Sequence, residues 1–230
     1  FAHADDMLGM LESVRSILAP DGLFYFEVSY LLDVVDKLLL GTILHEHVCY
    51  HAVTPLVAFL ERNGMRLVDV EHVAIQGGSL ICTAQHAASG RPESPQVAEF
   101  IRQEEVRGVH EDQFFAPFRD RLTHVRGSLQ RLLAEIADKD EEIVAYGAAR
   151  GGTFITYLFD LGRHIGFIVD DDSNKQGLFS PGHHIPVLPV KALYERCPAY
   201  VILLAWVHSV AIIADNRRYL DSGGNFITFF

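Results

Sequence analysis

The segment from Thr42 to Tyr50 (TILHEHVCY) places His45, Glu46 and His47 at consecutive positions. The residues around them are largely apolar, and charged groups in an apolar setting cost free energy unless they are paired or used. Burial and neighbouring charge also move pKa values toward the range in which proton transfer works at neutral pH. Two chemistries fit this triplet: a general base oriented by a carboxylate, or a metal site.

Spacing helps to decide between these two chemistries. On an extended segment His45 and His47 point to one side and Glu46 to the other, whereas on a helix His47 and His51 would share a face. The HExxH order of zinc-binding helices is absent, and the sequence predicts a helix that begins only at Pro55. Three adjacent ligands rarely close a tetrahedral site. The pattern favours acid–base chemistry, with a structural histidine pair and a metal site as alternatives.

A second candidate site lies in the segment 146–152 (YGAARGG), between a predicted strand and a predicted helix. Its glycines allow a tight turn, which begins at Tyr146 and Gly147 and exposes backbone amides to phosphate at a helix N-terminus. Arg150 could add a bidentate phosphate contact, and Lys175, in a turn after the next strand, is placed to meet a diphosphate. The spacing differs from GxGxxG, so the loop alone is a weak dinucleotide signal.

Further candidates have structural alternatives. Asp170 ends a predicted strand where Rossmann domains place a ribose-binding carboxylate, although an acidic loop or a helix cap also fits. Trp206 ends another strand at the ligand-binding edge, where packing is favoured over stacking on a ligand ring. Gly77 and Gly78 indicate either a turn that needs positive φ or a close approach of backbone to ligand. The histidine pair 183–184 lies in a Pro/Gly loop, which favours a structural role.

The elements that must position these residues form two patterns. Residues 6–18 have helical spacing, 23–28 form a buried strand, and 66–73 and 79–84 form a predicted hairpin. A polar linker then leads to a long helical stretch, 96–139, interrupted near Gly108. From 143 onward short strands and helices alternate, which predicts an α/β fold with a doubly wound parallel sheet.

Composition narrows the possible partners. The chain has 230 residues, of which 49% are hydrophobic and 21% charged, as is typical of a globular protein. The net charge of −11 argues against nucleic acid as a partner. No apolar run approaches the length of a membrane span, and no signal peptide is visible, so no membrane partner is expected. Three scattered cysteines without CxxC spacing fit a reducing cytoplasm.

The pattern Thr-Ile-x-His-Glu-His-x-x-Tyr resembles the signature of S-adenosylmethionine-dependent sugar C-methyltransferases, which methylate carbon in nucleotide-linked keto-sugars. Other segments agree with this family in order along nearly the whole chain. They are FAHADD (1–6), LAPDG (18–22), FEVSYL (26–31), GGSL (77–80), YGA (146–148), NKQG (174–177), PGHHIP (181–186) and AW (205–206).

The resemblance assigns roles to the candidate residues. It implies that His47 is a general base that removes the proton beside the keto group, and that Glu46 orients it or contacts a sugar hydroxyl. His3 would hold or protonate the enolate oxygen, and a structural histidine at a strand end is the alternative for this residue. The C-terminal domain would close over a nucleotide-diphosphate sugar. The glycine-rich loop for S-adenosylmethionine and the zinc-binding cysteine region are expected upstream of Phe1.

The resemblance also implies a division of the chain. Residues 1–86 would form the C-terminal part of a class I methyltransferase sheet, 87–140 a linker and helical connector, and 141–230 a Rossmann-like domain. The chain departs from the family pattern at Leu44, Gln76 and Ile81, where a Tyr, a His and an Arg are usual. These departures leave a non-catalytic nucleotide-sugar-binding module as an alternative, with an NAD-type oxidoreductase as a further one.

Overall fold

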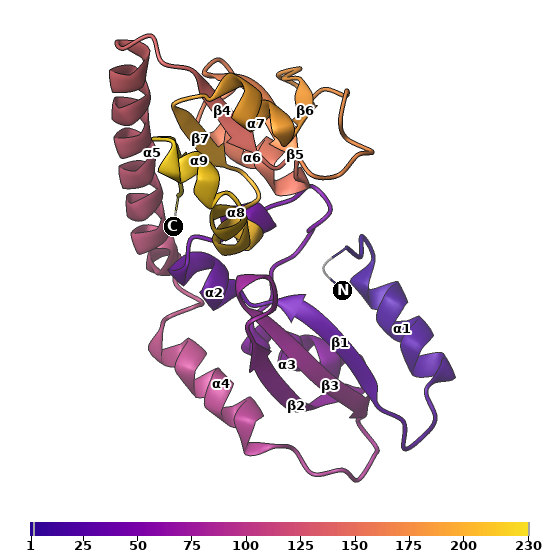
Figure 1. Cartoon of the computed structure of the whole chain (residues 1–230). Coiled ribbons are helices and arrows are strands. Elements are labelled where there is room, and N and C mark those ends of the chain that lie inside the picture. The colour runs from indigo at the N-terminus through magenta and orange to yellow at the C-terminus, as the bar shows by residue number, and fades with distance from the viewer. Residues whose placement is uncertain (2, 230) are drawn as a thin grey trace. The chain divides into compact units, whose positions relative to one another are not determined.

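The computed structural model describes Phe1 and residues 3–229, which divide into two compact units (Figure 1). Unit 1 comprises residues 1–39 and 45–119, and unit 2 comprises 40–44 and 120–230. The short piece Leu40–Leu44 is therefore part of unit 2, although the residues on both sides of it belong to unit 1.

Unit 1 contains a three-stranded antiparallel sheet. Its strands are β1 (Phe24–Ser29), β2 (Met65–Val73) and β3 (Ser79–His86), in the order β1-β3-β2. The predicted hairpin between β2 and β3 is confirmed, and its connection is the short 3₁₀ turn η2 (Ile75–Gly77).

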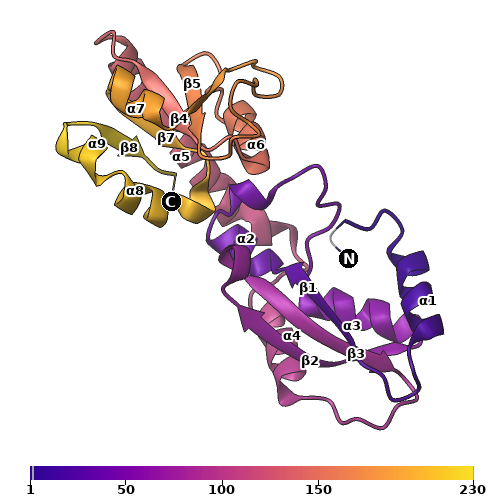
Figure 2. The ribbon, with the colours of Figure 1, turned by 45° about the vertical axis from the view of Figure 1, so that its right-hand side comes forward.

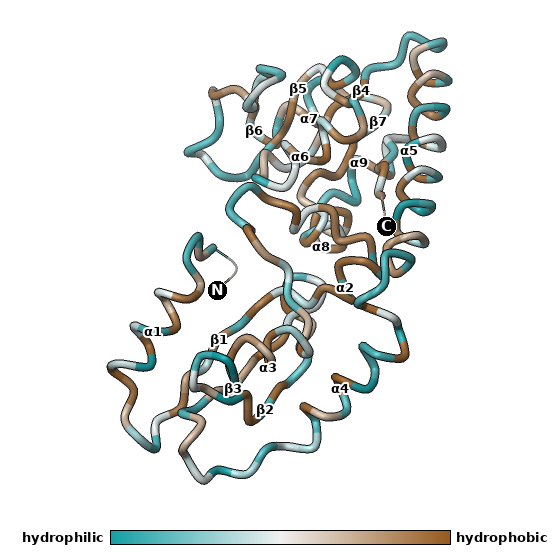
Figure 3. Tube along the Cα trace, turned by 180° about the vertical axis from the view of Figure 1, so that it is seen from behind, coloured by the Kyte–Doolittle hydropathy of each residue, from teal (hydrophilic) through white to brown (hydrophobic). Residues whose placement is uncertain are grey.

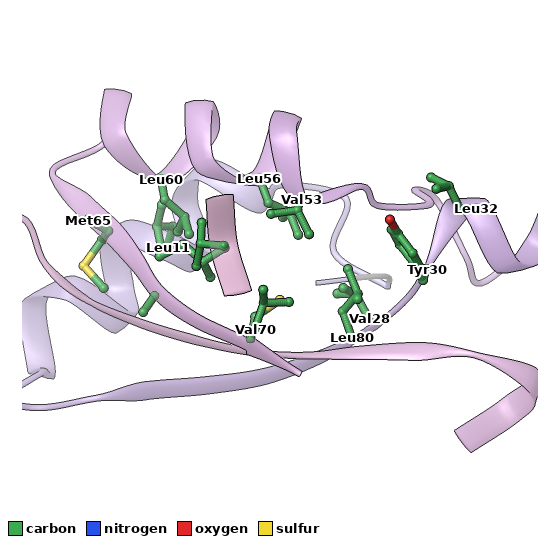
Figure 4. Packing of buried hydrophobic residues seen from close by; sticks show 14 of the residues in the cluster. Leu11, Val28, Tyr30, Leu32, Val53, Leu56, Leu60, Met65, Val70 and Leu80 are labelled. Atoms are coloured by element: carbon green, nitrogen blue, oxygen red, sulfur yellow. The ribbon is translucent and has the colours of Figure 1, made fainter. Parts of the chain in front are cut away.

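Four helices accompany this sheet. They are α1 (Met7–Ile17), α2 (Leu31–Asp36), α3 (Val53–Arg62) and α4 (Pro95–Val106). The buried side chains of α1 and α3, among them Leu11 and Leu56, pack with those of the three strands into one apolar core (Figure 4). The 3₁₀ turn η3 (Asp112–Phe115) separates α4 from α5 (Ala116–Ala137), so the long helical stretch is interrupted as predicted.

Unit 2 contains a five-stranded parallel sheet. Its strands are β4 (Ile143–Tyr146), β5 (Ile165–Asp170), β6 (Val187–Pro189), β7 (Tyr200–Leu203) and β8 (Asn225–Ile227). Their order is β6-β5-β4-β7-β8, and every pairing is parallel. The chain starts in the middle, builds outward to β6 and returns to the other side of β4. This is the predicted doubly wound, Rossmann-like arrangement.

Helices cover both faces of this sheet (Figure 2). Helices α7 (Lys191–Arg196), α8 (Ser209–Asp215) and α9 (Arg217–Asp221) share an apolar cluster with one face of β4, β5 and β7. Helix α6 (Arg150–Leu158) lies on the opposite face. Hydrophobic residues recur along α5 between hydrophilic ones (Figure 3), and its buried residues are Leu129, Leu133 and Ile136. No helix among the described residues is long and apolar enough to cross a membrane.

The pH dependence of stability should reflect one buried histidine of unit 1. His51 is only 6% exposed, and its Nε2 has no hydrogen-bond partner among the described residues. Burial lowers the pKa of His51 to about 4 from 6.5. The imidazole is thus neutral when folded and takes up a proton on unfolding, so its contribution is complete above pH 6.5 and is lost as the pH falls toward 4.

We therefore expect acidification from about pH 7.5 to about pH 5 to remove about 2 kcal/mol of stability through His51 alone. Urea unfolding of the wild type and of His51→Phe at both values measures this contribution, because phenylalanine has no proton to gain. An equal loss of stability in both proteins would contradict the assignment to His51.

Candidate functional site

The structure brings together two of the predicted catalytic residues. The rings of His3 and His47 are stacked with centroids 5.1 Å apart and an interplanar angle of 24°. His3 lies in the turn before α1, and His47 lies in the irregular segment 43–52 that leads to α3. Glu46, next to His47 in the chain, is partly buried. Neutral imidazole accepts a proton and its neighbour can donate one to an oxygen, so the pair can perform acid–base chemistry.

Tyr50 is a member of this group that the sequence reasoning did not assign a role. Its ring meets that of His47 edge-on, with centroids 6.1 Å apart and an angle of 72°. The tyrosine was visible as the last residue of the sequence pattern, three positions after His47. The contact fixes the plane of the His47 ring from a second side.

The C-terminal end of the segment that carries His47 is held in unit 1 by hydrogen bonds. Tyr30 and His51 form an isolated parallel β-bridge, in which the amide of His51 donates to Ser29. The carboxylate of Glu104, from α4, accepts hydrogen bonds from the amides of Val53 and Thr54 and from the hydroxyls of Tyr30 and Thr54.

The space next to Gly77 and Gly78 is filled by other residues of the protein. They have φ of +89° and +155°. The carbonyl of Gly77 accepts a hydrogen bond of 2.7 Å from Lys37, and a Cβ at Gly78 would lie 2.2 Å from the carboxyl of Asp33. Asp33 in turn contacts Nε2 of His72 at 2.6 Å. The turn and its close approach therefore serve the packing of α2 against the hairpin.

A cavity of about 230 Å³ lies at the carboxyl ends of β4, β5 and β7 in unit 2. Two of the predicted ligand-binding residues, Gly147 and Lys175, line it together with the first turn of α6. The N-cap residue of α6, Ala149, makes no side-chain cap, so the amides of this turn can meet an anion. Apolar side chains complete the wall: Ile168, Leu178, Phe179, Pro181, Val187 and Leu204.

The carboxylate of Asp170 already has hydrogen-bond and ion-pair partners within the protein beside this cavity. It accepts hydrogen bonds from the amides of Ala148 at 2.6 Å and Asp172 at 2.8 Å, and Lys175 lies 3.3 Å away. A ribose would have to compete with these internal partners. These hydrogen bonds could not be predicted from the sequence, because they depend on how the loops after β4 and β5 meet.

The remaining predicted ligand-binding residues lie outside the residues that line this cavity. Tyr146 is buried, and its hydroxyl donates to Asp171 at 2.7 Å; burial, and next this hydrogen bond, raises the pKa of the phenol. Arg150 is the exposed first residue of α6. Trp206 begins the 3₁₀ turn η4 (Trp206–His208) and packs on Gly41.

Among the described residues, no group of three or more His, Cys, Asp or Glu side chains could hold a metal ion. In the histidine pair 183–184, the ring of His183 packs on that of Tyr157, with ring centroids 4.3 Å apart.

Fold and cavity define unit 2 as a Rossmann-like domain with its ligand cavity at the carboxyl edge of a parallel sheet. Residues 74–230 match the family model described as "C-methyltransferase C-terminal domain". The chain is 34% identical over 228 residues to C-methyltransferase NovU of Streptomyces niveus. The aligned residues make up 99% of this chain and 54% of that protein. The chain therefore belongs to the C-methyltransferase family, and it spans about half the length of the curated relative that it matches.

Proposed function

We propose that this chain is part of an S-adenosylmethionine-dependent enzyme that methylates a carbon atom of a nucleotide-linked keto-sugar. The observation that carries this proposal is the stacked pair of His3 and His47, which the fold assembles from distant parts of the sequence. Family membership gives the reaction class, and the relative NovU is itself a C-methyltransferase.

The chain's own residues supply proton transfer. His47 removes the proton from the carbon beside the keto group, since histidine is the side chain that most often serves as a general base at neutral pH. Glu46 orients this base or contacts a sugar hydroxyl, and His3 donates to the oxygen on which negative charge develops. S-adenosylmethionine would supply the methyl group as an electrophile. The described part of unit 1 has no glycine-rich strand-to-helix loop, so none of its residues is assigned to that cofactor.

The cavity of unit 2 is proposed to bind the nucleoside diphosphate. Its apolar wall and its few polar groups are those of a small-molecule site. The amides of the first turn of α6 and the ammonium group of Lys175 would meet the phosphates. The committed carboxylate of Asp170 makes an NAD-type oxidoreductase the weaker alternative, because a dinucleotide needs that group for its ribose.

The reaction is tested on the full-length enzyme with a uridine- or deoxythymidine-diphosphate keto-sugar in deuterated water. We expect deuterium to appear on the carbon beside the keto group even without the methyl donor. When the methyl donor is present, we expect a methylated product. Binding of the sugar nucleotide with neither exchange nor methylation would refute the enzyme and leave the non-catalytic binding module, to which Leu44, Gln76 and Ile81 point.

Replacing Lys175 by alanine should weaken binding of uridine or deoxythymidine diphosphate about 10-fold, because a charge-assisted hydrogen bond contributes about 1.5 kcal/mol. Isothermal titration calorimetry measures the affinity. Lys191→Ala is the matched control, since Lys191 lies on α7 with its side chain 73% exposed. Equal affinities of the Lys175 variant and the wild type would remove Lys175 from the phosphate site.

A further inference from the structure

One part of the wall of the unit 2 cavity consists of large apolar side chains that solvent can reach. Leu178 and Phe179 are consecutive in the chain, are 58% and 62% exposed, and both line the cavity. Single exposed apolar side chains are common on protein surfaces, but a group of them beside a cavity is typical of a ligand-binding site. Pro181, from the same loop, continues this wall. The ring of Phe179 is therefore available to a ligand in the cavity.

The exposure of Phe179 does not come from a loosely held loop. Phe179 lies in the loop 171–186 between β5 and β6 (Figure 1), where it forms an isolated antiparallel β-bridge with Pro186. Directly after it, the amide of Ser180 donates to the carbonyl of Ile185 at 2.8 Å. The backbone at Phe179 is thus paired with the other arm of the loop, within unit 2.

The tip of this loop is packed on helix α6. A Cβ at Gly182 would collide with the hydroxyl of Tyr157, which lies on α6, and the ring of His183 packs on the ring of the same tyrosine. The first turn of α6 also lines the cavity. One helix therefore supports both the loop and the amides proposed to meet the phosphates, so little ordering would be needed when a ligand binds.

The chemistry of the wall favours the nucleobase over the sugar as the group that it contacts. A sugar carries hydroxyl groups, and these lose free energy when they are buried without hydrogen-bond partners. The hydroxyl of Thr156 already donates to the carbonyl of Gly152 at 2.6 Å. The hydroxyl of Ser180 already accepts from the amide of Ile185 at 3.0 Å. The flat face of a base needs no such partners and gains from contact with an aromatic ring.

We propose that Phe179 is the residue on which the nucleobase of the substrate stacks, and that Leu178 and Pro181 complete the base subsite. The proposal rests on the proposed function, since it assigns the nucleoside diphosphate to this cavity. The loop 171–186 then contacts both parts of the ligand, the phosphates through Lys175 and the base through Phe179. Because every base has an aromatic face, the subsite contributes affinity and does not choose among bases.

The test measures binding of uridine diphosphate and of inorganic pyrophosphate to the full-length enzyme by isothermal titration calorimetry. We expect Phe179→Ala to weaken binding of uridine diphosphate about 10-fold, as for the loss of one base–aromatic stack. The same variant should change the affinity for pyrophosphate less than about 2-fold, because pyrophosphate has no base. Lys175→Ala should weaken binding of both ligands, since it acts on the phosphates.

Two further variants control for the fold and for the loss of a ring. Phe179→Trp keeps a flat aromatic ring and should bind uridine diphosphate within about 3-fold of the wild type. Phe115→Ala is the same substitution at a 39% exposed phenylalanine of unit 1 and should change neither affinity.

Two results would overturn the base subsite. The first is an unchanged affinity of Phe179→Ala for uridine diphosphate. The second is an equal loss of affinity for uridine diphosphate and for pyrophosphate, which would mean that Phe179 acts through the fold of the loop. A wild type that binds neither ligand would instead refute the proposed phosphate site itself, and with it the nucleotide assigned to this cavity.

Discussion

Replacing His47 by glutamine in the full-length enzyme should lower turnover at least about 100-fold, the usual scale for loss of a general base. Glutamine keeps a similar length and can form hydrogen bonds, but it cannot take up a proton at neutral pH. Binding of the sugar nucleotide should change little, because the cavity assigned to the diphosphate lies in unit 2. Steady-state kinetics and calorimetry measure the two quantities separately.

His45→Gln is the matched control for this variant. His45 is exposed and lies two positions earlier in the same segment, so the substitution is chemically identical and leaves the stack of His3 on His47 intact. Its turnover should stay near that of the wild type. Should His47→Gln turn over as fast as His45→Gln, His47 would have no part in the reaction.

Deuterium exchange separates the base from the methyl transfer. With His47 replaced, the carbon beside the keto group should exchange its proton at least about 100-fold more slowly, even when no methyl donor is present. A variant that exchanges normally but fails to methylate would place His47 in the transfer step and not in deprotonation.

The local patterns of the sequence predicted the elements well. The alternation of short strands and helices after residue 143 predicted the parallel sheet, because each buried strand and amphipathic helix has its own periodicity. Strand β6 was missed: it has three residues, ends in Pro189 and lies at the sheet edge, so it has almost no pattern of its own.

Hydrogen-bond partners that are distant in sequence explain where the observed helix boundaries differ from the predicted ones. Helix α3 was predicted to begin at Pro55 and begins at Val53, where no neighbouring side chain caps it. The missing acceptor is Glu104 on α4, which binds the amides of Val53 and Thr54. Such a cap depends on the packing of two helices and leaves no signature at the helix start.

For the candidate site too, the sequence identified residues, whereas the contacts between them are visible only in the fold. Residue types and spacing singled out the segment that carries His47, and the family resemblance added His3, but only the fold shows that their rings are stacked. The assignment of Leu40–Leu44 to unit 2 had no signal in the sequence, since Gly41 meets Gly151 and Trp206 only in the folded chain. A glycine that leaves room for a distant indole ring looks like any loop glycine in sequence.

Replacing Glu104 by glutamine should lower the free energy of unfolding by about 3 kcal/mol, the largest effect on stability that we expect. The carboxylate is fully buried and accepts hydrogen bonds of 2.6 Å from Val53, of 2.8 and 2.6 Å from Thr54, and of 3.3 Å from Tyr30. Burial, and next the charge of Glu104, raises the pKa of the Tyr30 phenol, which therefore remains a donor.

A glutamine side chain has nearly the same size but turns one acceptor into a donor. Its amide nitrogen would face an N–H or hydroxyl group that already donates, so at least one buried donor loses its partner, at about 1–3 kcal/mol. The negative charge at the N-terminus of α3 is lost as well, which adds up to about 2 kcal/mol in a buried setting. For a chain of this size, 3 kcal/mol corresponds to a fall in Tm of roughly 6–12 °C.

Glu105→Gln is the matched control, because Glu105 is the next residue of α4 and is exposed. Thermal unfolding should separate the two variants clearly. Equal Tm values would mean that the carboxylate of Glu104 is replaceable and that α3 does not depend on it. Since Tyr30 and Val53 flank the segment that carries His47, the Glu104 variant should also lose turnover at temperatures well below its Tm, while Glu105→Gln should not.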